Sequence, residues 1–494
     1  MTRSLVRAVA VAAVGAALLL DSGSASPLLR TGPGSLDQRF GSGGKVTTIV
    51  APSAYANAVA LAPDGAIIAA GSAAVDDASR FAVVRYRPDG TVDNVAATAF
   101  GPGSAFANAV APQSDGRVVV AGFAAATGET SGTFALARYD ADGALDRSFG
   151  DGGRVTTALA GPAVANGVSV QSDGKIVAAG TVSGTRDRFA LVRYEPNGTL
   201  DPTFGVRGVV TTSVGAGSGL TSLALAGDGS IVAAGWSATE AAVRFAVARY
   251  RTDGSLDPSF GRGGVTTTAI GEDDTADDVL IQPDGKIVVG GGSLASSYDR
   301  FGVARYRRNG TLDPSFGNGG RVATSVGSGN IASPIAIAVE PDGKLLAVGS
   351  SEANWMVSFA VARYDARGRL DRGFGEHGGV VTTKFDLDRA FARGAVLQRD
   401  GKIVVAGYAD YGGSYRFALA RYVVVGCVVP DVRGARIRVA ARTIRLADCA
   451  LGRVSSAFSR RTRAGRVVAE RPAAGARLPQ GAKVDLVLSR GPKR

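Results

Sequence analysis

The sequence predicts an all-β protein: a seven-bladed β-propeller of four-stranded blades, followed by a small α+β domain. Three observations lead to this fold class. The dipeptide Arg-Tyr recurs at intervals of 53–58 residues, each copy holds short apolar runs separated by Asp-Gly or Asn-Gly turns, and the last strand of the repeat is out of phase with the rest. The seven dipeptides are Arg85-Tyr86, Arg138-Tyr139, Arg193-Tyr194, Arg249-Tyr250, Arg305-Tyr306, Arg363-Tyr364 and Arg421-Tyr422.

One copy of the repeat, residues 167–212, illustrates the four strands. Apolar runs at 167–172 and 175–180 flank Ser-Asp-Gly and therefore predict a hairpin. A third strand is expected at 189–194, and a turn at Pro196-Asn197-Gly198 leads to a fourth strand at 209–212. Because helical periodicity is absent and each unit is long enough for four antiparallel strands, a propeller is favoured over a solenoid.

The N-terminal segment is expected to close the ring. The chain has a Leu36-Asp37 segment and a Val46-Thr47-Thr48 segment before its first hairpin, and no equivalent follows Arg421-Tyr422. We therefore expect the N-terminal strand to complete the last blade, which removes an open sheet edge. The copy around Val92-Asp93-Asn94 lacks Val-Thr-Thr, so its outer strand is expected to be missing or frayed.

One spacing in the repeat does not vary: an Asp follows each of the first six Arg-Tyr arginines by eight residues. Strand alternation puts this Arg on the same face as a Phe, which implies partial burial, and a half-buried Arg needs a carboxylate partner. Arg421 lacks such an Asp and is expected to pair with Asp37. A structural role is favoured over a ring of anion sites. The other predicted pairs are Arg85–Asp93, Arg138–Asp146, Arg193–Asp201, Arg249–Asp257, Arg305–Asp313 and Arg363–Asp371.

The repeat resembles the delta-60 repeat of bacterial exported proteins, a β-propeller family, over residues 36–422. The resemblance rests on the segments DGK[IV]VVAG, FA[VL][AV]RY and GxLDxxFGxGG. It implies a propeller fold and an extracellular setting, and it implies no established chemistry.

After Tyr422 the repeat stops, and residues 427–491 resemble a PASTA domain. The matching residues are Val429-Pro430-Asp431-Val432 with Gly434, Gly465-x-Val467-Val468 leading to Pro472-x-x-Gly475, and Gly481-x-x-Val484 closing at Ser489-x-Gly491. A helix is expected at 439–446 and two strands in the final third. The resemblance implies binding to uncrosslinked peptidoglycan or related wall fragments. Cys427 and Cys449 fit a local disulfide, with two free thiols as the alternative.

All of the excess positive charge lies in this last domain. Residues 427–494 hold 16 Lys+Arg against 4 Asp+Glu, so they account for the whole chain's net charge of +12, and residues 1–426 are neutral. The expected partner is peptidoglycan or another anionic wall polymer. Nucleic acid is not expected, because the basic residues are not interleaved with aromatic ones. The alternative reading is that the arginines only keep the domain soluble.

Residues 1–25 are typical of a secretory signal. Arg3 and Arg7 precede an apolar run from Ala8 to Leu20, and Gly23-Ser24-Ala25 is a small-residue cleavage site. A retained membrane anchor is the alternative, although the run is short for a bilayer. The expected organisation is a signal at 1–25, a linker at 26–35, the propeller at 36–422, a linker at 423–426, the PASTA-like domain at 427–491 and a tail at 492–494. The protein is expected to be secreted or wall-associated, monomeric, and without a transmembrane segment after signal removal.

The sequence offers few candidate catalytic residues, and neither a cofactor nor a metal is expected. His377 is the single histidine, and both cysteines lie in the last domain. The densest acidic cluster could chelate Ca²⁺, although a solvated acidic loop is the favoured interpretation. Its members are Glu272, Asp273, Asp274, Asp277 and Asp278.

The irregular loops are the expected place for binding. The loops between second and third strands and the connections between blades should share one face of the propeller. Aromatic side chains there suit stacking on a glycan or packing on a protein, and local packing is the alternative. The candidates are Phe123, Trp236, Tyr298, Trp355, Tyr408, Tyr411 and Tyr415.

Two functions follow as hypotheses. The first is a non-enzymatic, wall-associated protein whose propeller is an interaction platform. The second is a secreted carbohydrate-active enzyme that uses a carboxylate pair on the loop face, which would require two carboxylates about 5–9 Å apart.

Overall fold

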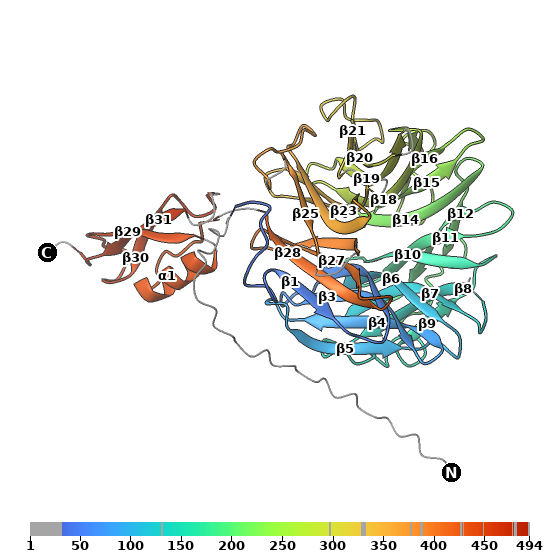
Figure 1. Ribbon diagram of the computed structural model, residues 1–494, viewed down its shortest axis with the longest axis horizontal. Coiled ribbons are helices and arrows are strands. Elements are labelled where there is room, and N and C mark those ends of the chain that lie inside the picture. Colours follow the sequence, from blue (N-terminus) through green and yellow to red (C-terminus); the bar gives the residue numbers. More distant parts are fainter. Residues whose placement is uncertain are drawn as a thin grey trace, which may run out of the picture. The chain divides into compact units, whose positions relative to one another are not determined.

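The computed structural model describes residues 32–492, except 130–131, 296–297, 328–331, 376–377, 386–388, 425–426, 428, 448, 477 and 479–481. Within these residues the chain forms seven four-stranded antiparallel sheets, followed by a three-stranded sheet with one helix (Figure 1). The fold is therefore a seven-bladed β-propeller with a small α+β domain, as predicted. The expected signal peptide and His377 lie outside the described residues.

The seven blades follow one another along the chain, and the first strand of each blade contacts the first strands of its two neighbours, so these strands form the inner wall of the ring. The blades are β2 (Ala54–Leu61), β3 (Ile67–Val75), β4 (Ala78–Tyr86) and β5 (Val92–Thr98); β6 (Ala105–Pro112), β7 (Val118–Ala125), β8 (Gly132–Tyr139) and β9 (Arg154–Thr157); β10 (Ala163–Val170), β11 (Ile176–Val182), β12 (Arg188–Tyr194) and β13 (Val209–Thr212); β14 (Gly217–Leu225), β15 (Ile231–Ala238), β16 (Val243–Tyr250) and β17 (Val265–Thr268); β18 (Asp273–Ile281), β19 (Ile287–Ala295), β20 (Tyr298–Tyr306) and β21 (Arg321–Thr324); β22 (Ala332–Val339), β23 (Leu345–Ala353), β24 (Met356–Tyr364) and β25 (Val380–Thr383); and β26 (Ala390–Leu397), β27 (Lys402–Asp410), β28 (Tyr415–Val423) and β1 (Lys45–Thr48).

The outer strand of the last blade comes from the N-terminal part of the chain. Strand β1 pairs antiparallel with β28, with Thr48 opposite Phe417. The backbone N–H of Asp37 donates to the carbonyl of Arg421 at 2.8 Å. Figure 1 shows β1 in blue beside β28 in orange. The predicted closure of the ring by the N-terminal strand is confirmed.

The first blade differs from the expectation that its outer strand is missing or frayed. Its outer strand β5 is present, and it pairs with β4 from Tyr86 opposite Val92 to Phe81 opposite Thr98. The Val-Thr-Thr segment is missing from the sequence, but Ala97-Thr98 occupies the same place, and the Thr98 hydroxyl bonds to the Tyr139 hydroxyl at 2.8 Å. The expectation of a missing strand was wrong because backbone pairing does not require the Val-Thr-Thr side chains.

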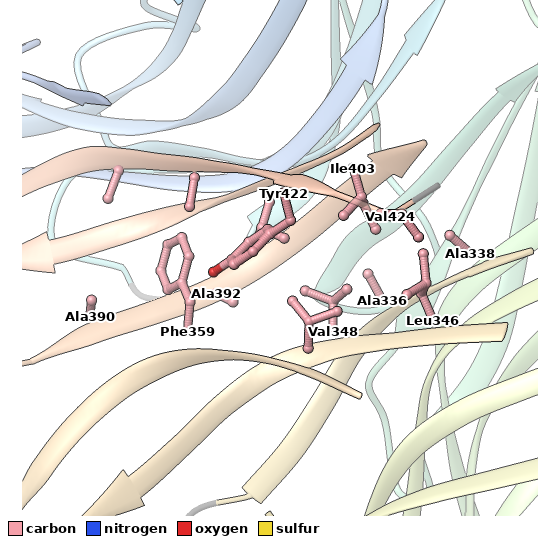
Figure 2. Close-up of a cluster of buried hydrophobic side chains, with 14 of the residues drawn as sticks. Ala336, Ala338, Leu346, Val348, Phe359, Ala390, Ala392, Ile403, Tyr422 and Val424 are labelled. Atoms are coloured by element: carbon pink, nitrogen blue, oxygen red, sulfur yellow. The ribbon is translucent and has the colours of Figure 1, made fainter. Parts of the chain in front are cut away.

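Adjacent blades are joined by a repeated hydrogen bond that the sequence analysis did not predict. In six blades the buried Tyr of Arg-Tyr bonds through its hydroxyl, at 2.8–2.9 Å, to a Thr on the outer strand of the preceding blade. The Tyr86–Thr48 bond is the one that spans the closure of the ring. Apolar side chains fill the space around these bonds. Figure 2 shows this packing between the last two blades, where Tyr422 and Ile403 face Phe359 and Val348.

Each inner strand carries a β-bulge, and in four blades the side chain of the bulge residue donates to a backbone carbonyl of the next blade. Asn57 Nδ2 donates to the carbonyl of Ala107 at 2.8 Å, and Asn108 Nδ2 donates to that of Ala165 at 3.0 Å. Opposite the bulge stands the Gly of the second strand. A Cβ on Gly71 would lie 1.8 Å from the Tyr55 carbonyl oxygen, so the bulge leaves no room for a side chain there.

The small domain has its own core. Helix α1 (Ile437–Leu446) begins two residues before the predicted start, and the sheet has the order β29 (Ala450–Ala457), β31 (Lys483–Ser489), β30 (Val467–Arg471). Cys427 and Cys449 form the expected disulfide within this core. Of the residues that the structure describes, no helix is long and apolar enough to cross a membrane.

Candidate binding face of the propeller

The structure brings each predicted Arg–Asp pair together. The closest Arg nitrogen lies 2.6–3.2 Å from an Asp oxygen in all seven blades. The pair that spans the termini, Arg421 Nη2 to Asp37 Oδ2, measures 2.8 Å, and both side chains are buried. In six blades a second cation reaches the same Asp; for example, Lys175 Nζ lies 2.8 Å from Asp201 Oδ2. Burial raises the pKa of Asp201, but hydrogen bonds from Lys175, Thr203 and Arg193 outweigh it and lower the pKa.

The paired guanidinium groups are used within the fold. Arg305 donates to Asp313 at 2.9 Å, to the Ser315 hydroxyl at 3.2 Å, and to the carbonyl of Ala366 in the next blade at 2.8 Å. Its Cζ also lies 4.6 Å from the centroid of the Phe316 ring. Because these buried donors are already satisfied, this geometry favours the structural interpretation over a ring of anion sites.

Four of the five carboxylates in the acidic cluster accept hydrogen bonds within the fold. Most of the cluster lies on strand β18, so the interpretation as a solvated loop was wrong. Asp273 accepts a bond from the backbone N–H of Val243, and Asp277 accepts one from that of Gly292. Asp274 is fully buried and accepts bonds from two backbone N–H groups in the turn before the strand. In the part of the chain that is described, no three His, Cys, Asp or Glu side chains are grouped to hold a metal ion.

Asp278, the last member of that cluster, instead connects three blades. Its carboxyl accepts bonds from the Ser222 hydroxyl at 2.9 Å and from the Ile337 backbone N–H at 2.9 Å, which belong to the two neighbouring inner strands. Burial raises the pKa of Asp278 to about 6, although these hydrogen bonds and one from Val279 lower it. The residue is therefore a titratable link in the inner wall.

The predicted loop-face aromatic residues fall into separate groups. Trp236 on β15 lies against Gly219, and Phe123 on β7 stacks on Phe106 at a centroid distance of 5.0 Å. Trp355 lies in the turn between β23 and β24 and is 89% exposed, with a left-handed φ of 65°. Tyr298 begins β20.

Tyr408, Tyr411 and Tyr415 lie on the last blade, around the β27–β28 turn. Tyr408 and Tyr415 form an aromatic cluster with Tyr55 of the first blade, with centroid distances of 4.7 Å for Tyr55–Tyr415, 4.9 Å for Tyr55–Tyr408 and 5.6 Å for Tyr408–Tyr415. Phe391 on β26 stacks on Tyr408 at 5.1 Å. These four rings are partly exposed, so this tyrosine cluster presents aromatic surface to solvent across the ring closure, whereas Tyr411 packs against the core between the last two blades.

Guanidinium groups border the tyrosine cluster. Arg389 Cζ lies 5.2 Å from the centroid of the Phe391 ring, and outside the cluster Arg416 Cζ lies 3.9 Å from that of Tyr411. Arg393 Nη2 donates to the Tyr408 hydroxyl at 3.0 Å. Asp410 raises the pKa of Tyr415, so this phenol stays protonated at neutral pH. The cluster therefore offers aromatic faces, phenol hydroxyls and cations to one ligand.

The sequence analysis missed Tyr55 and Phe391 because both lie at the start of an inner strand rather than in a loop. The strand register carried a signal for both residues. Each lies directly opposite the residue that follows Ala-Gly in the second strand: Tyr55 lies opposite Ser72, and Phe391 lies opposite Tyr408. Cross-strand partners lie on the same sheet face, so strand register would have placed these rings beside the loop-face candidates.

The small domain presents mostly basic surface. Arg433 Nη2 lies 2.7 Å from Asp431 Oδ2, and Arg433 Nε lies 3.8 Å from Oε1 of the buried Glu470. Burial raises the pKa of Glu470, and Asp431 adds to this effect. Most of the acidic groups of the domain thus lie close to an arginine or to a backbone N–H, as with Asp485, which accepts a bond from Arg453 N.

Fold and surface define a seven-bladed β-propeller protein with an appended PASTA domain. Residues 428–490 match the PASTA domain model. The chain belongs to the family described as domain of unknown function (DUF5122) beta-propeller. Its model matches residues 62–94, 113–149, 171–204, 226–260, 282–316, 340–374 and 398–422.

Comparison with solved structures adds distant likenesses. The chain is 29% identical to the extracellular region of the Ser/Thr kinase PrkC from Staphylococcus aureus, over 13% of this chain and 23% of that one, with a TM-score of 0.13. It is 12% identical to an aldose sugar dehydrogenase from Streptomyces coelicolor, over 64% and 94% of the two chains, with a TM-score of 0.38. A GH74 xyloglucanase from Xanthomonas campestris is 11% identical, over 80% and 58%, with a TM-score of 0.42. No curated protein matches the chain.

Proposed function

We propose that this is an exported, non-enzymatic binding protein of the cell wall, in which the PASTA domain binds peptidoglycan or another anionic wall polymer. The observation that carries the proposal is the coincidence of the PASTA domain with the basic charge. Residues 427–494 hold the entire net charge of +12, whereas residues 1–426 hold equal numbers of basic and acidic side chains.

The propeller supplies a second surface in this proposal. The tyrosine cluster, Tyr55, Phe391, Tyr408 and Tyr415, joins the first and last blades and is bordered by Arg389 and Arg393. Flat, half-exposed aromatic rings next to guanidinium groups suit stacking on a glycan or anchoring a protein partner. The propeller is thus an interaction platform that the PASTA domain keeps near the wall.

A sedimentation assay with isolated peptidoglycan tests the anchoring role. Residues 32–494 should sediment with the polymer, and a chain truncated after Val424 should remain in the supernatant. A Tyr408→Ala/Tyr415→Ala variant is the matched control, because it alters the platform and leaves the PASTA domain intact. Equal sedimentation of the full and truncated chains would reject the PASTA domain as the anchor. Release of soluble sugars during the assay would instead support the carboxylate-based enzyme.

A further inference from the structure

The outward face of helix α1 combines arginines with exposed aliphatic side chains. Ala440, Ala441 and Ile444 point into the core of the small domain. Arg438, Val439, Arg442 and Leu446 are all exposed, and their helical spacing places them together on the opposite side. Val439 is 57% exposed and Leu446 is 59% exposed. This set of four residues is called the α1 face below.

Helix stability does not account for these charges. The helix has no acidic residue in its first turn, and Arg436 precedes it without a side-chain capping bond. Arg438 adds a second cation at the positive end of the helix dipole, where a cation is unfavourable. The helix is also free of acidic residues along its whole length, Ile437–Leu446. An anionic partner would offset this repulsion, since guanidinium groups bind phosphate oxygens in a bidentate manner.

The aliphatic residues identify the kind of anionic partner. A hydrated wall polymer gains little from Val439 and Leu446, whereas the boundary between headgroups and acyl chains of a bilayer accepts such side chains together with neighbouring cations. We propose that the α1 face binds an anionic phospholipid surface. This goes beyond the proposed wall binding, because it would place the PASTA domain at the boundary between membrane and wall.

Vesicle co-sedimentation tests this proposal with residues 32–494, which omit the apolar N-terminal run. The protein should bind vesicles that contain phosphatidylglycerol and should not bind vesicles of phosphatidylcholine alone. Arg438→Gln/Arg442→Gln should weaken binding roughly 10- to 30-fold, since each arginine near an anionic surface contributes substantially to affinity. Val439→Ser/Leu446→Ser should also weaken it several-fold with the charge unchanged.

Phe458→Ser is the matched control, because Phe458 is 54% exposed in the same domain but lies outside α1. It should bind like the parent protein. Parent-like binding by Val439→Ser/Leu446→Ser would overturn the proposal and indicate recognition of phosphate alone, as in a wall polymer. Equal binding to both vesicle types, or to neither, would also overturn it. Circular dichroism of each variant establishes that it folds, and peptidoglycan sedimentation of the same variants tests the wall-binding proposal separately.

Discussion

At the scale of single residues, one guanidinium in each of six blades connects three elements. Arg305 bonds to an Asp of its own blade and to a backbone carbonyl of the next blade, and it also stacks on a Phe ring. The invariant spacing of eight residues thus has a physical reason. The turn holds a carboxylate where a buried Arg needs it, and the same Arg positions the neighbouring blade.

The seven pairs differ in burial, which predicts different stability losses. Asp201 is fully buried, whereas the side chains of Arg249 and Asp257 are each 17% exposed. Asp201→Asn should destabilise the propeller by about 3–5 kcal/mol, because it leaves the buried Arg193 without its counterion. Asp257→Asn should cost about 1 kcal/mol, since solvent screens that pair. Urea denaturation of both variants measures the difference, and equal losses would contradict the burial argument.

The contribution of Asp278 to stability should depend on pH in the opposite direction from the contribution of the Arg–Asp pairs. The pKa of Asp278 is raised to about 6, so its ionised carboxylate destabilises the fold at neutral pH. The free energy of unfolding should therefore increase as the pH falls from about 7 towards 4 and the carboxylate takes up a proton. The paired Asp201 has a lowered pKa, so its contribution is kept in that range and is lost only at lower pH. The melting temperature should therefore rise between pH 7.5 and pH 5. In Asp278→Asn this rise should be reduced, and an unchanged rise would contradict the assignment.

At the scale of elements, the segment before β1 is an integral part of the last blade. Asp37 is the counterion of the buried Arg421 and Lys402, Phe40 is fully buried, and Thr48 bonds to Tyr86. Removing residues 1–48 should expose the edge of β28 and leave the buried Arg421 without its carboxylate partner. We expect aggregation or strand-exchanged oligomers in size-exclusion chromatography. Removal of residues 1–31 is the control and should leave a folded protein, and a stable monomer after the longer deletion would contradict the closure.

Most elements could be predicted because the turn signals recur in each copy. Asp-Gly and Asn-Gly turns mark hairpins by local backbone chemistry, and the unpaired Leu36–Thr48 segment revealed the closure. The acidic run at 272–278 was wrongly predicted to be a solvated loop, because its high charge density was given more weight than the apolar residues beside it. Strand β18 tolerates these carboxylates since backbone N–H groups and Ser222 satisfy them. Bulges and inter-blade Tyr–Thr bonds depend on tertiary contact, which one copy of the repeat does not reveal.

At the scale of the whole molecule, the propeller and the PASTA domain have separate cores and should respond separately to reduction. The disulfide between Cys427 and Cys449 lies in the core of the small domain. Opening it should destabilise that domain by about 3 kcal/mol for a loop of this length. Differential scanning calorimetry with and without dithiothreitol should show that only the transition of the small domain moves. A shift of the propeller transition by the same amount would indicate a single cooperative unit.

The functional surface was only partly predictable. Tyr408, Tyr411 and Tyr415 were among the predicted binding residues because aromatic residues in irregular loops stand out, and the structure places Tyr408 and Tyr415 together. Trp236 lies in a different blade, where it packs on Gly219. Tyr55 completes the cluster only because the ring closes, which brings the first blade beside the last. Loop composition thus indicated the face, and the closure determined which residues meet there.

Hydrogen–deuterium exchange of residues 32–494, with and without soluble peptidoglycan fragments, tests the central claim most directly. Binding by the PASTA domain predicts slower exchange at amides within 427–491 and unchanged exchange in the inner strands of the propeller. If the platform also takes part, the β27–β28 turn should be protected as well. Protection confined to the propeller, or none in either domain at saturating ligand, would contradict the account.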